Sequence, residues 1–277
     1  MILKEKARKI VQPRDAATVI LMREPRDSGG PFEILLVRRH ARSRFCSEFH
    51  VYPGGMLDES DWAPEIESFC TGMDCTTAGS LMADLPPVKA LGSWAAGIRE
   101  TFEEVGILLA SDSSGSLISL QSPEDRKRFQ AYRKELNKGR LQLQKMLEAE
   151  GLKLAADRLF YFSHWITPEA LPLRYNVRFF VARAPQCQEA LHDGYELTDH
   201  IWLSPAGALR ACDEGRIALV LPTISTLSEL TAFNTIDQVI KSTEGKKIPP
   251  ILTRMELVED NYVEIMPDGS IFGPSPV

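Results

Sequence analysis

The chain has 277 residues, a formal net charge of −6 at pH 7 and five cysteines, and its isoelectric point is near 5.5. This length is enough to bury a large core, and we expect one elaborated domain over residues 1–277. The acidic balance argues against nucleic-acid binding, which normally requires a basic face. No apolar run of about 18 residues is present, so we expect no membrane contact and a cytoplasmic protein. The cysteines form no C-x-x-C pair and predict free thiols in a reducing compartment.

Two strands are predicted near the N-terminus, over residues 17–22 and 32–37, on either side of a turn. A third short strand within residues 45–53 leads directly into Gly54 and Gly55. Paired glycines let backbone amides come close to phosphate oxygens. Gly54 and Gly55 are therefore candidate substrate-binding positions.

An acidic helix follows further along the chain. At about 100° per residue, Glu100, Glu103 and Glu104 share one face of this helix. The opposite face is apolar and suited to packing on a sheet, and it carries Trp94, Ile98, Phe102, Val105 and Leu109. Arg99 precedes Glu103 by four residues and is expected to pair with it. Clustered carboxylates repel one another unless a cation lies among them, and hard oxygen ligands favour Mg²⁺ or Mn²⁺.

Acidic runs of this kind are also common on solvated helix surfaces, where they have no catalytic role. The glycine pair upstream favours the functional interpretation, because a metal site and a phosphate-binding turn are the two parts that a diphosphate requires. The sequence thus predicts a site for a divalent metal and a diphosphate.

Two inserts are expected around these motifs. The segment of about residues 62–92 is rich in Gly, Pro, Ser and Thr and is predicted to be an irregular loop. The segment of about residues 111–157 is predicted to form a helix or a helix pair that lies over the pocket or makes a dimer contact. Apolar side chains recur in it at helical spacing, at Phe129, Tyr132, Leu136, Leu143 and Leu147.

The C-terminal half is expected to complete the sheet and to cover it. Strands resume over residues 158–166 and 175–182. His164 in the first of them is interpreted as a packed strand residue rather than a catalytic base. A C-terminal cover of about residues 222–277 is predicted, with one helix over residues 225–240. This cover ends in a hairpin whose turn is at Asp268 and Gly269.

The glycine turn and the acidic helix together resemble the Nudix box, the signature of the Nudix hydrolase superfamily, G-x5-E-x7-R-E-U-x-E-E-x-G-U, where U is aliphatic. Gly55 matches the first glycine, and the second half is matched by Arg99, Glu100, Glu103, Glu104, Gly106 and Ile107. Thr101 stands at an aliphatic position, and Asp61 stands at the first acidic position. Between Asp61 and Arg99 lie 37 residues where the pattern has seven. Such an insert in a surface loop costs little closure entropy.

A box divided in this way resembles one branch of the superfamily, the peroxisomal-type coenzyme A diphosphatases and their bacterial relatives. Their phrase V-F-P-G-G-x-L-D is similar to V-Y-P-G-G-M-L-D at residues 51–58. The resemblance extends over about residues 17–221. It implies the α+β Nudix fold, a mixed β-sheet sandwiched between α-helices, to which the helical and loop inserts are added.

The resemblance also implies metal-dependent hydrolysis of a diphosphate linkage in a nucleoside diphosphate derivative. Metal ligands would be Glu100, Glu103 and Glu104, and Glu103 acts either on the metal or mainly through Arg99. Arg99, Glu100 and Glu103 are the candidate catalytic set. Glu196, in a later loop, is a candidate further metal ligand.

Coenzyme A or an acyl-coenzyme A is the substrate that this branch implies, cleaved to adenosine 3′,5′-bisphosphate and a phosphopantetheine product. Arg38 is then a candidate cation for a substrate phosphate. ADP-ribose or NADH is an alternative substrate for the same reaction. A non-catalytic Nudix-fold nucleotide sensor is an alternative of another class, and a diphosphate isomerase would need a catalytic cysteine, for which Cys46 is near the glycine turn. For the hydrolase and for the sensor the expected partner is a small-molecule nucleotide.

Overall fold

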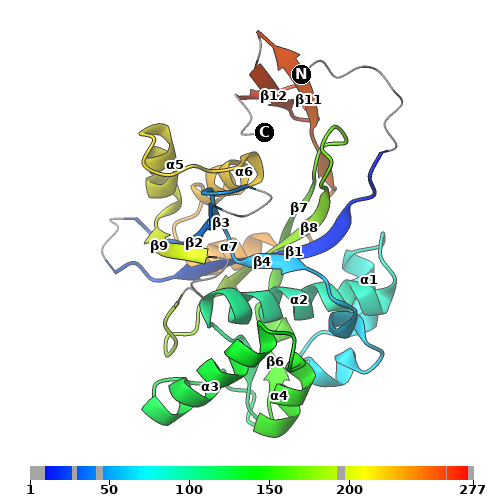
Figure 1. Ribbon diagram of the computed structural model, residues 1–277, viewed down its shortest axis with the longest axis vertical. Helices are drawn as coiled ribbons and strands as arrows, with labels where there is room; N and C mark the ends of the chain where they lie inside the picture. Colours follow the sequence, from blue (N-terminus) through cyan, green and yellow to red (C-terminus); the bar gives the residue numbers. More distant parts are fainter. Residues whose placement is uncertain (1–9, 27–29, 42–45, 192–196, 260, 274–277) are drawn as a thin grey trace.

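The computed structural model describes residues 10–26, 30–41, 46–191, 197–259 and 261–273 (Figure 1). In this part of the chain the strands of the main sheet are β1 (Arg14–Arg23), β2 (Glu33–Arg39), β3 (His50–Val51), β4 (Gly54–Met56), β7 (Phe160–Ile166), β8 (Tyr175–Arg183), β9 (Leu197–Leu203) and β10 (Ile251–Leu252). Their order is β10-β7-β8-β1-β2-β3, with β4 beside β1 and β9 beside β2. Strand β1 is parallel to β8 and antiparallel to β2, so the sheet is mixed.

The helices are α1 (Cys75–Leu81), α2 (Pro87–Val105), α3 (Pro123–Leu136), α4 (Leu143–Glu150), α5 (Pro205–Asp213), α6 (Leu221–Leu230) and α7 (Ile236–Ser242). Short 3₁₀ turns lie at Glu59–Trp62, Ile66–Phe69 and Ala156–Arg158. Two small sheets stand apart from the main one, formed by β5 (Ala110–Ser111) with β6 (Lys153–Leu154), and by β11 (Arg254–Val258), β12 (Asn261–Ile265) and β13 (Ile271–Phe272). Among the described helices, none combines the length and the apolar character that crossing a bilayer requires.

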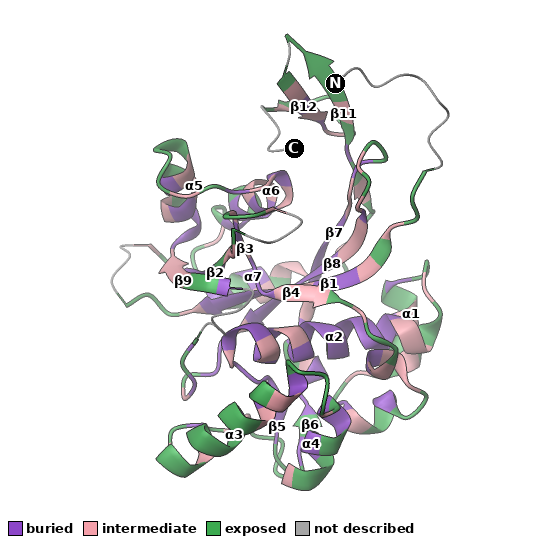
Figure 2. Ribbon diagram, in the orientation of Figure 1, coloured by how far each residue is buried: buried purple, intermediate pink, exposed green. Residues whose placement is uncertain are grey.

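Alternate residues of β1 enter two hydrophobic cores, one on each face of the sheet. Val19 and Leu21 pack in the core that contains Trp94 of α2, whereas Ile20 and Met22 pack in the core under α6 and α7. This separation follows from the two-residue period of a strand. Helices therefore cover both faces of the sheet (Figures 1 and 2), and the expected α+β fold with a mixed sheet between helices is confirmed.

Helix α2 carries the acidic motif, begins at Pro87, before the predicted apolar stripe, and ends at Val105, so Leu109 lies beyond the helix. Pro87 occupies its first turn, where a missing amide hydrogen costs nothing, and Gly106 follows its last residue with a left-handed φ of 73°. The expectation that residues 62–92 form an irregular loop is wrong. Helix α1 lies within that segment, with the Asp74 carboxylate accepting a hydrogen bond from the Thr77 amide at its N-terminus, and α1 packs against α2.

The insert of about residues 111–157 was predicted to form a helix or a helix pair, and it forms the pair α3 and α4. Arg133 of α3 reaches the C-terminal end of α2, where helix carbonyls lack intrahelical partners. Its Nε and Nη2 donate to the carbonyl oxygens of Glu103 and Glu104 at 2.9 and 2.7 Å. Asn137 Nδ2 donates to the Glu103 carbonyl at 3.2 Å. The insert thus caps the helix that bears the glutamates.

The C-terminal part differs from expectation in one respect. The single helix predicted over residues 225–240 is two helices, α6 and α7, because Thr235 starts a new helix by accepting a hydrogen bond from the Gln238 amide. The hairpin turn at Asp268 and Gly269 is confirmed, between β12 and β13. The β11–β13 sheet projects from the body beside the ends of β7 and β8 (Figure 1).

Replacing Arg133 by alanine is expected to lower the free energy of unfolding by about 1–3 kcal/mol, since two carbonyls at the end of α2 lose buried hydrogen bonds and the favourable charge at a helix C-terminus is lost. Urea denaturation measures this change. The matched control is Lys134→Ala, which removes an exposed cation from the next position and is expected to change stability by less than about 0.5 kcal/mol. Equal effects of the two substitutions would contradict the capping role.

Candidate active site

The guanidinium of Arg99 joins the two halves of the divided motif. Its Nε and Nη2 donate to the two carboxylate oxygens of Asp61, both at 2.9 Å. Nη1 donates to Glu100 and to Glu103, both at 2.9 Å, and Nη2 also donates to the Met56 carbonyl at 2.8 Å. The Asp61 side chain is only 2% exposed, and Arg99 lies 38 residues further along the chain. The Asp61–Arg99 pair therefore holds the two ends of the long insert together.

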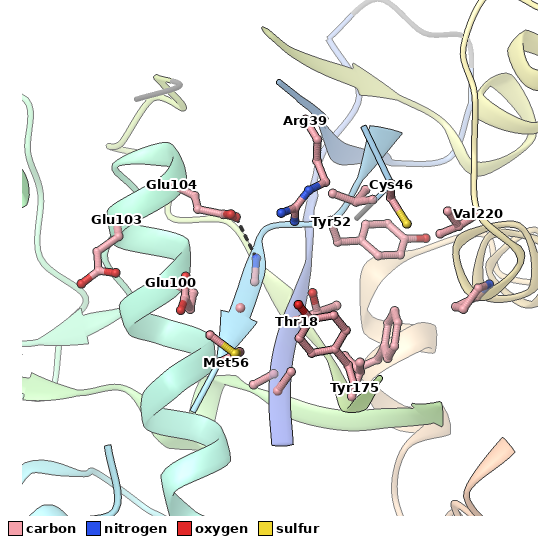
Figure 3. A pocket seen from close by; sticks show the side chains of 18 of the residues that line it. Thr18, Arg39, Cys46, Tyr52, Met56, Glu100, Glu103, Glu104, Tyr175 and Val220 are labelled. Carbon is pink, nitrogen blue, oxygen red and sulfur yellow. Dashed lines mark hydrogen bonds between the residues drawn. The ribbon is translucent and has the colours of Figure 1, made fainter. Parts of the chain in front are cut away.

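Strand β4 lies against the acidic face of α2. The Gly54 amide donates to Glu104 Oε2 at 2.8 Å, as the dashed line in Figure 3 shows. A Cβ at Gly55 would lie 2.5 Å from the Glu100 carboxylate, and a Cβ at Gly54 would overlap the side chain of Thr18. Both glycines are thus required for the close approach of strand, helix and sheet.

The three glutamates all line one cleft, but their carboxylates point in two directions. Figure 3 shows Glu100 and Glu104 directed toward β4 and Glu103 directed away from it. Glu103 is held by Arg99, as its i,i+4 spacing predicted. Among the described residues, no group of three or more His, Cys, Asp or Glu side chains is placed to hold a metal ion together. The structure therefore brings Glu100 and Glu104 to β4, the strand that carries Gly54 and Gly55, whereas Glu103 contacts only Arg99 among these groups and Glu100 contacts Arg99 as well.

The charges of this cluster are unbalanced. Arg99 is the shared partner of Asp58, Asp61, Glu100 and Glu103. Burial raises the pKa of Glu100 to about 7, opposed by Arg99 and reinforced by the negative charge of Glu103. Burial likewise raises the pKa of Glu103. One guanidinium among several buried carboxylates leaves an excess of negative charge that a divalent cation would offset. Oxygen donors of this kind suit a hard cation, and Mg²⁺ commonly takes only one or two protein carboxylates, with water and phosphate completing its shell.

The cleft has a volume of about 1560 Å³ and is bordered by α2, the end of α3, β4, β1, the β7–β8 hairpin and the start of α6. Arg39 lines it, and its buried Nε has no hydrogen-bond partner among the described residues. Figure 3 shows its guanidinium directed toward the glycine strand, across from Glu104. Arg38 is exposed and pairs with Glu48 at 2.9 Å, outside the residues that line the cleft. A bulge between Arg38 and Arg39 shifts the register of β2 against β9, so the sequence alternation does not reveal which arginine enters the cleft.

The other residues considered from sequence have different surroundings. Glu196 lies outside the described residues. Cys46 lines the cleft, but burial raises its pKa to about 12, so it is a protonated thiol rather than a nucleophile. His164 is buried in β7 and its Nε2 is 2.5 Å from Asn176 Oδ1, as expected of a packed strand residue. Asp61, which the spacing of the motif placed at its first acidic position, is the main partner of Arg99.

No protein-family model matches the chain. Among solved structures, the crystal structure of a Nudix hydrolase from Alicyclobacillus acidocaldarius is similar over 84% of this chain and 97% of that chain, with a TM-score of 0.68 and 26% identity. Acyl-coenzyme A diphosphatase NUDT19 of Xenopus laevis is 24% identical over 88% of this chain and 72% of its own length. The protein of the same name from Gallus gallus is 24% identical over 95% of this chain and 80% of its own length.

The fold, together with the glutamates of α2 beside Gly54 and Gly55, is similar to that of the Nudix hydrolases. Within that superfamily the chain resembles the coenzyme A diphosphatase branch, which confirms the resemblance that the divided motif indicated. The insert inside the motif is compatible with the fold because Asp61 and Arg99 still meet.

Replacing Asp61 by asparagine is expected to lower the free energy of unfolding by about 1–3 kcal/mol, because the asparagine NH₂ group would face N–H donors of Arg99 and Asp58 that a carboxylate oxygen now accepts. The control is Asp58→Asn, whose side chain is 66% exposed and 4.0 Å from Arg99, and its expected cost is below about 1 kcal/mol. Urea denaturation of both variants tests the difference. If the two variants were equally stable, the buried pair would not be the anchor of the insert.

Proposed function

We propose that this chain hydrolyses the diphosphate linkage of coenzyme A or an acyl-coenzyme A, giving adenosine 3′,5′-bisphosphate and the corresponding phosphopantetheine. The observation that carries the proposal is the pairing of Glu100 and Glu104 with the glycine strand, held by the Arg99–Asp61 pair across an insert. Support for the substrate comes from two relatives named acyl-coenzyme A diphosphatase, which this chain matches over 88% and 95% of its length.

Glu100 and Glu104 are proposed to hold Mg²⁺ or Mn²⁺. Glu103 is proposed to act mainly through Arg99, whose Nη1 lies 2.9 Å from its carboxylate. Glu196 is proposed as a further metal ligand. A divalent cation bound there would neutralise phosphate charge and lower the pKa of a bound water. Arg99 is a positioning residue, because all five of its N–H donors already hold Asp61, Glu100, Glu103 and the Met56 carbonyl.

The diphosphate is proposed to lie over β4, between the glutamates and Arg39. Gly54 and Gly55 let β4 lie close to Glu100 and Glu104, and so set the position of the strand over which the diphosphate would lie. The Arg39 guanidinium would donate to phosphate oxygens, which suit its forked geometry. In the reaction, water oxygen forms a bond to one phosphorus, the bridging P–O–P bond breaks at that phosphorus, and the water proton passes to a carboxylate of the site.

Glu104→Gln is expected to lower kcat by about a hundredfold or more, with the free energy of unfolding within about 1 kcal/mol of the unmodified protein. Glutamine still offers an oxygen to the Gly54 amide, and the lost charge relieves repulsion among the neighbouring acids. The measurement of kcat follows turnover of coenzyme A with Mg²⁺ or Mn²⁺, before and after addition of a chelator. A urea denaturation curve gives the free energy of unfolding. An active variant would contradict the ligand role, and an unfolded variant would give Glu104 a structural role.

Arg39→Ala is expected to raise KM for the diphosphate substrate roughly ten- to a hundredfold, because one or two charge-assisted hydrogen bonds to phosphate are lost. The control is Arg38→Ala, which removes the adjacent exposed arginine and is expected to leave KM within about twofold. Steady-state kinetics of the two variants on one substrate gives the comparison. A larger effect at Arg38 would place the phosphate contact outside the cleft.

A further inference from the structure

Arg14, the first residue of β1, lies at the rim of the cleft. Residues 14, 16 and 18 alternate along β1 and so share one face of the sheet, and Ala16 and Thr18 both line the cleft. The residue beside Arg14 on β8 is Tyr175, which also lines the cleft. The side chain of Arg14 therefore leaves the sheet on the same side as the site residues.

The guanidinium of Arg14 has a weak partner. Its Nη1 lies 3.7 Å from Met56 Sδ, and a thioether sulfur is a poor acceptor. Among the described residues, this sulfur is the only side-chain partner of the guanidinium. By contrast, Arg23 at the other end of the same strand pairs with Glu33 at 2.7 Å. Exchanging the sulfur for a phosphate oxygen would give Arg14 a charge-assisted hydrogen bond at little cost.

Arg14 and Arg39 approach β4 from its two ends. Gly54, at the first end, donates to Glu104, and Figure 3 shows Arg39 across from Glu104. Met56, at the other end, is the residue that Arg14 contacts. Two residues of a strand span only about 7 Å. A ligand with two adjacent phosphates that lies along β4 would therefore offer one phosphate to each arginine.

Building on the proposed function, we infer that Arg14 is a second phosphate-binding residue and forms a clamp with Arg39, in which each guanidinium holds one phosphate of the diphosphate. The Arg14 side chain turns from Met56 Sδ to the phosphate, whose oxygens match the forked geometry of a guanidinium. Such a clamp recognises two adjacent phosphates rather than one, and it does so independently of the groups attached at either end.

Arg14→Ala is expected to raise KM for coenzyme A about five- to tenfold and to leave kcat within about twofold, because a contact made equally in the ground and transition states contributes to binding alone. Arg14→Lys keeps the charge without the fork and is expected to raise KM only about two- to threefold. The control is Arg26→Ala, an exposed arginine beyond the other end of β1 and outside the cleft, which is expected to leave KM unchanged. Steady-state kinetics measures these values.

A double variant tests whether the two arginines hold different phosphates. Independent contacts add in free energy, so the increases in KM caused by Arg14→Ala and by Arg39→Ala are expected to multiply when the substitutions are combined. Methylenediphosphonate, whose P–C–P bridge is not hydrolysed, tests binding without turnover. With Mg²⁺ present, isothermal titration calorimetry is expected to show that each substitution weakens binding of this probe about fivefold or more.

Two results would overturn the inference. If Arg14→Ala left both KM and the affinity for methylenediphosphonate unchanged, Arg14 would not bind phosphate, although the proposed function would stand. If the double variant were no weaker than Arg39→Ala alone, the two arginines would not hold separate phosphates. A failure to cleave any coenzyme A compound would instead contradict the proposed function, and the calorimetric comparison would still decide whether the clamp exists.

Discussion

The buried guanidinium of Arg99 is the interaction on which the site depends. Taking a cation and several carboxylates out of water costs much free energy, and only well-placed mutual hydrogen bonds offset that cost. Arg99 achieves this by using Asp61, two glutamates of its own helix and the Met56 carbonyl at the same time. The glycine strand, the 3₁₀ turn that carries Asp61 and helix α2 are thereby held in one arrangement. Glu100, Glu104 and the two glycines of β4 are positioned by this arrangement.

The helical insert and the loop insert both contact helix α2 or the sheet and so help to hold the Arg99 cluster in position. Arg133 of the helical insert caps the end of α2 directly behind Glu103 and Glu104. At the other end, Lys89 in the first turn of α2 pairs with Asp15 of β1 at 2.6 Å, and Arg178, fully buried in β8, pairs with both Asp15 and Asp84. Helix α2 is therefore tied to the sheet and to both inserts, and an insertion within the motif leaves its geometry intact.

The sequence predicted those parts of the structure that depend on local spacing. The acidic face of α2 and the Arg99–Glu103 pair follow from the helical period, and the strands of the sheet follow from apolar runs. Helix α1 was missed because its C-T-T-A-G-S-L segment has poor helix propensity and forms by packing on α2. The Asp61–Arg99 contact spans 38 residues, and the choice of Arg39 over Arg38 depends on a bulge, so neither could be derived from local pattern. The kind of site could be predicted from the residue types, because they alone define a carboxylate cluster and a glycine turn. The contacts that assemble the site could not be predicted in this way.

The proposed activity is cleavage of the diphosphate bond of coenzyme A compounds. The most direct measurement is mass spectrometry of the products formed from coenzyme A, octanoyl-coenzyme A, ADP-ribose and NADH with Mg²⁺ or Mn²⁺ in water enriched in ¹⁸O. We expect adenosine 3′,5′-bisphosphate and a phosphopantetheine product, with one ¹⁸O atom incorporated in one of the two phosphates. AMP from ADP-ribose or NADH alone would contradict the substrate, and the absence of any cleavage would contradict the account of this site as a diphosphohydrolase.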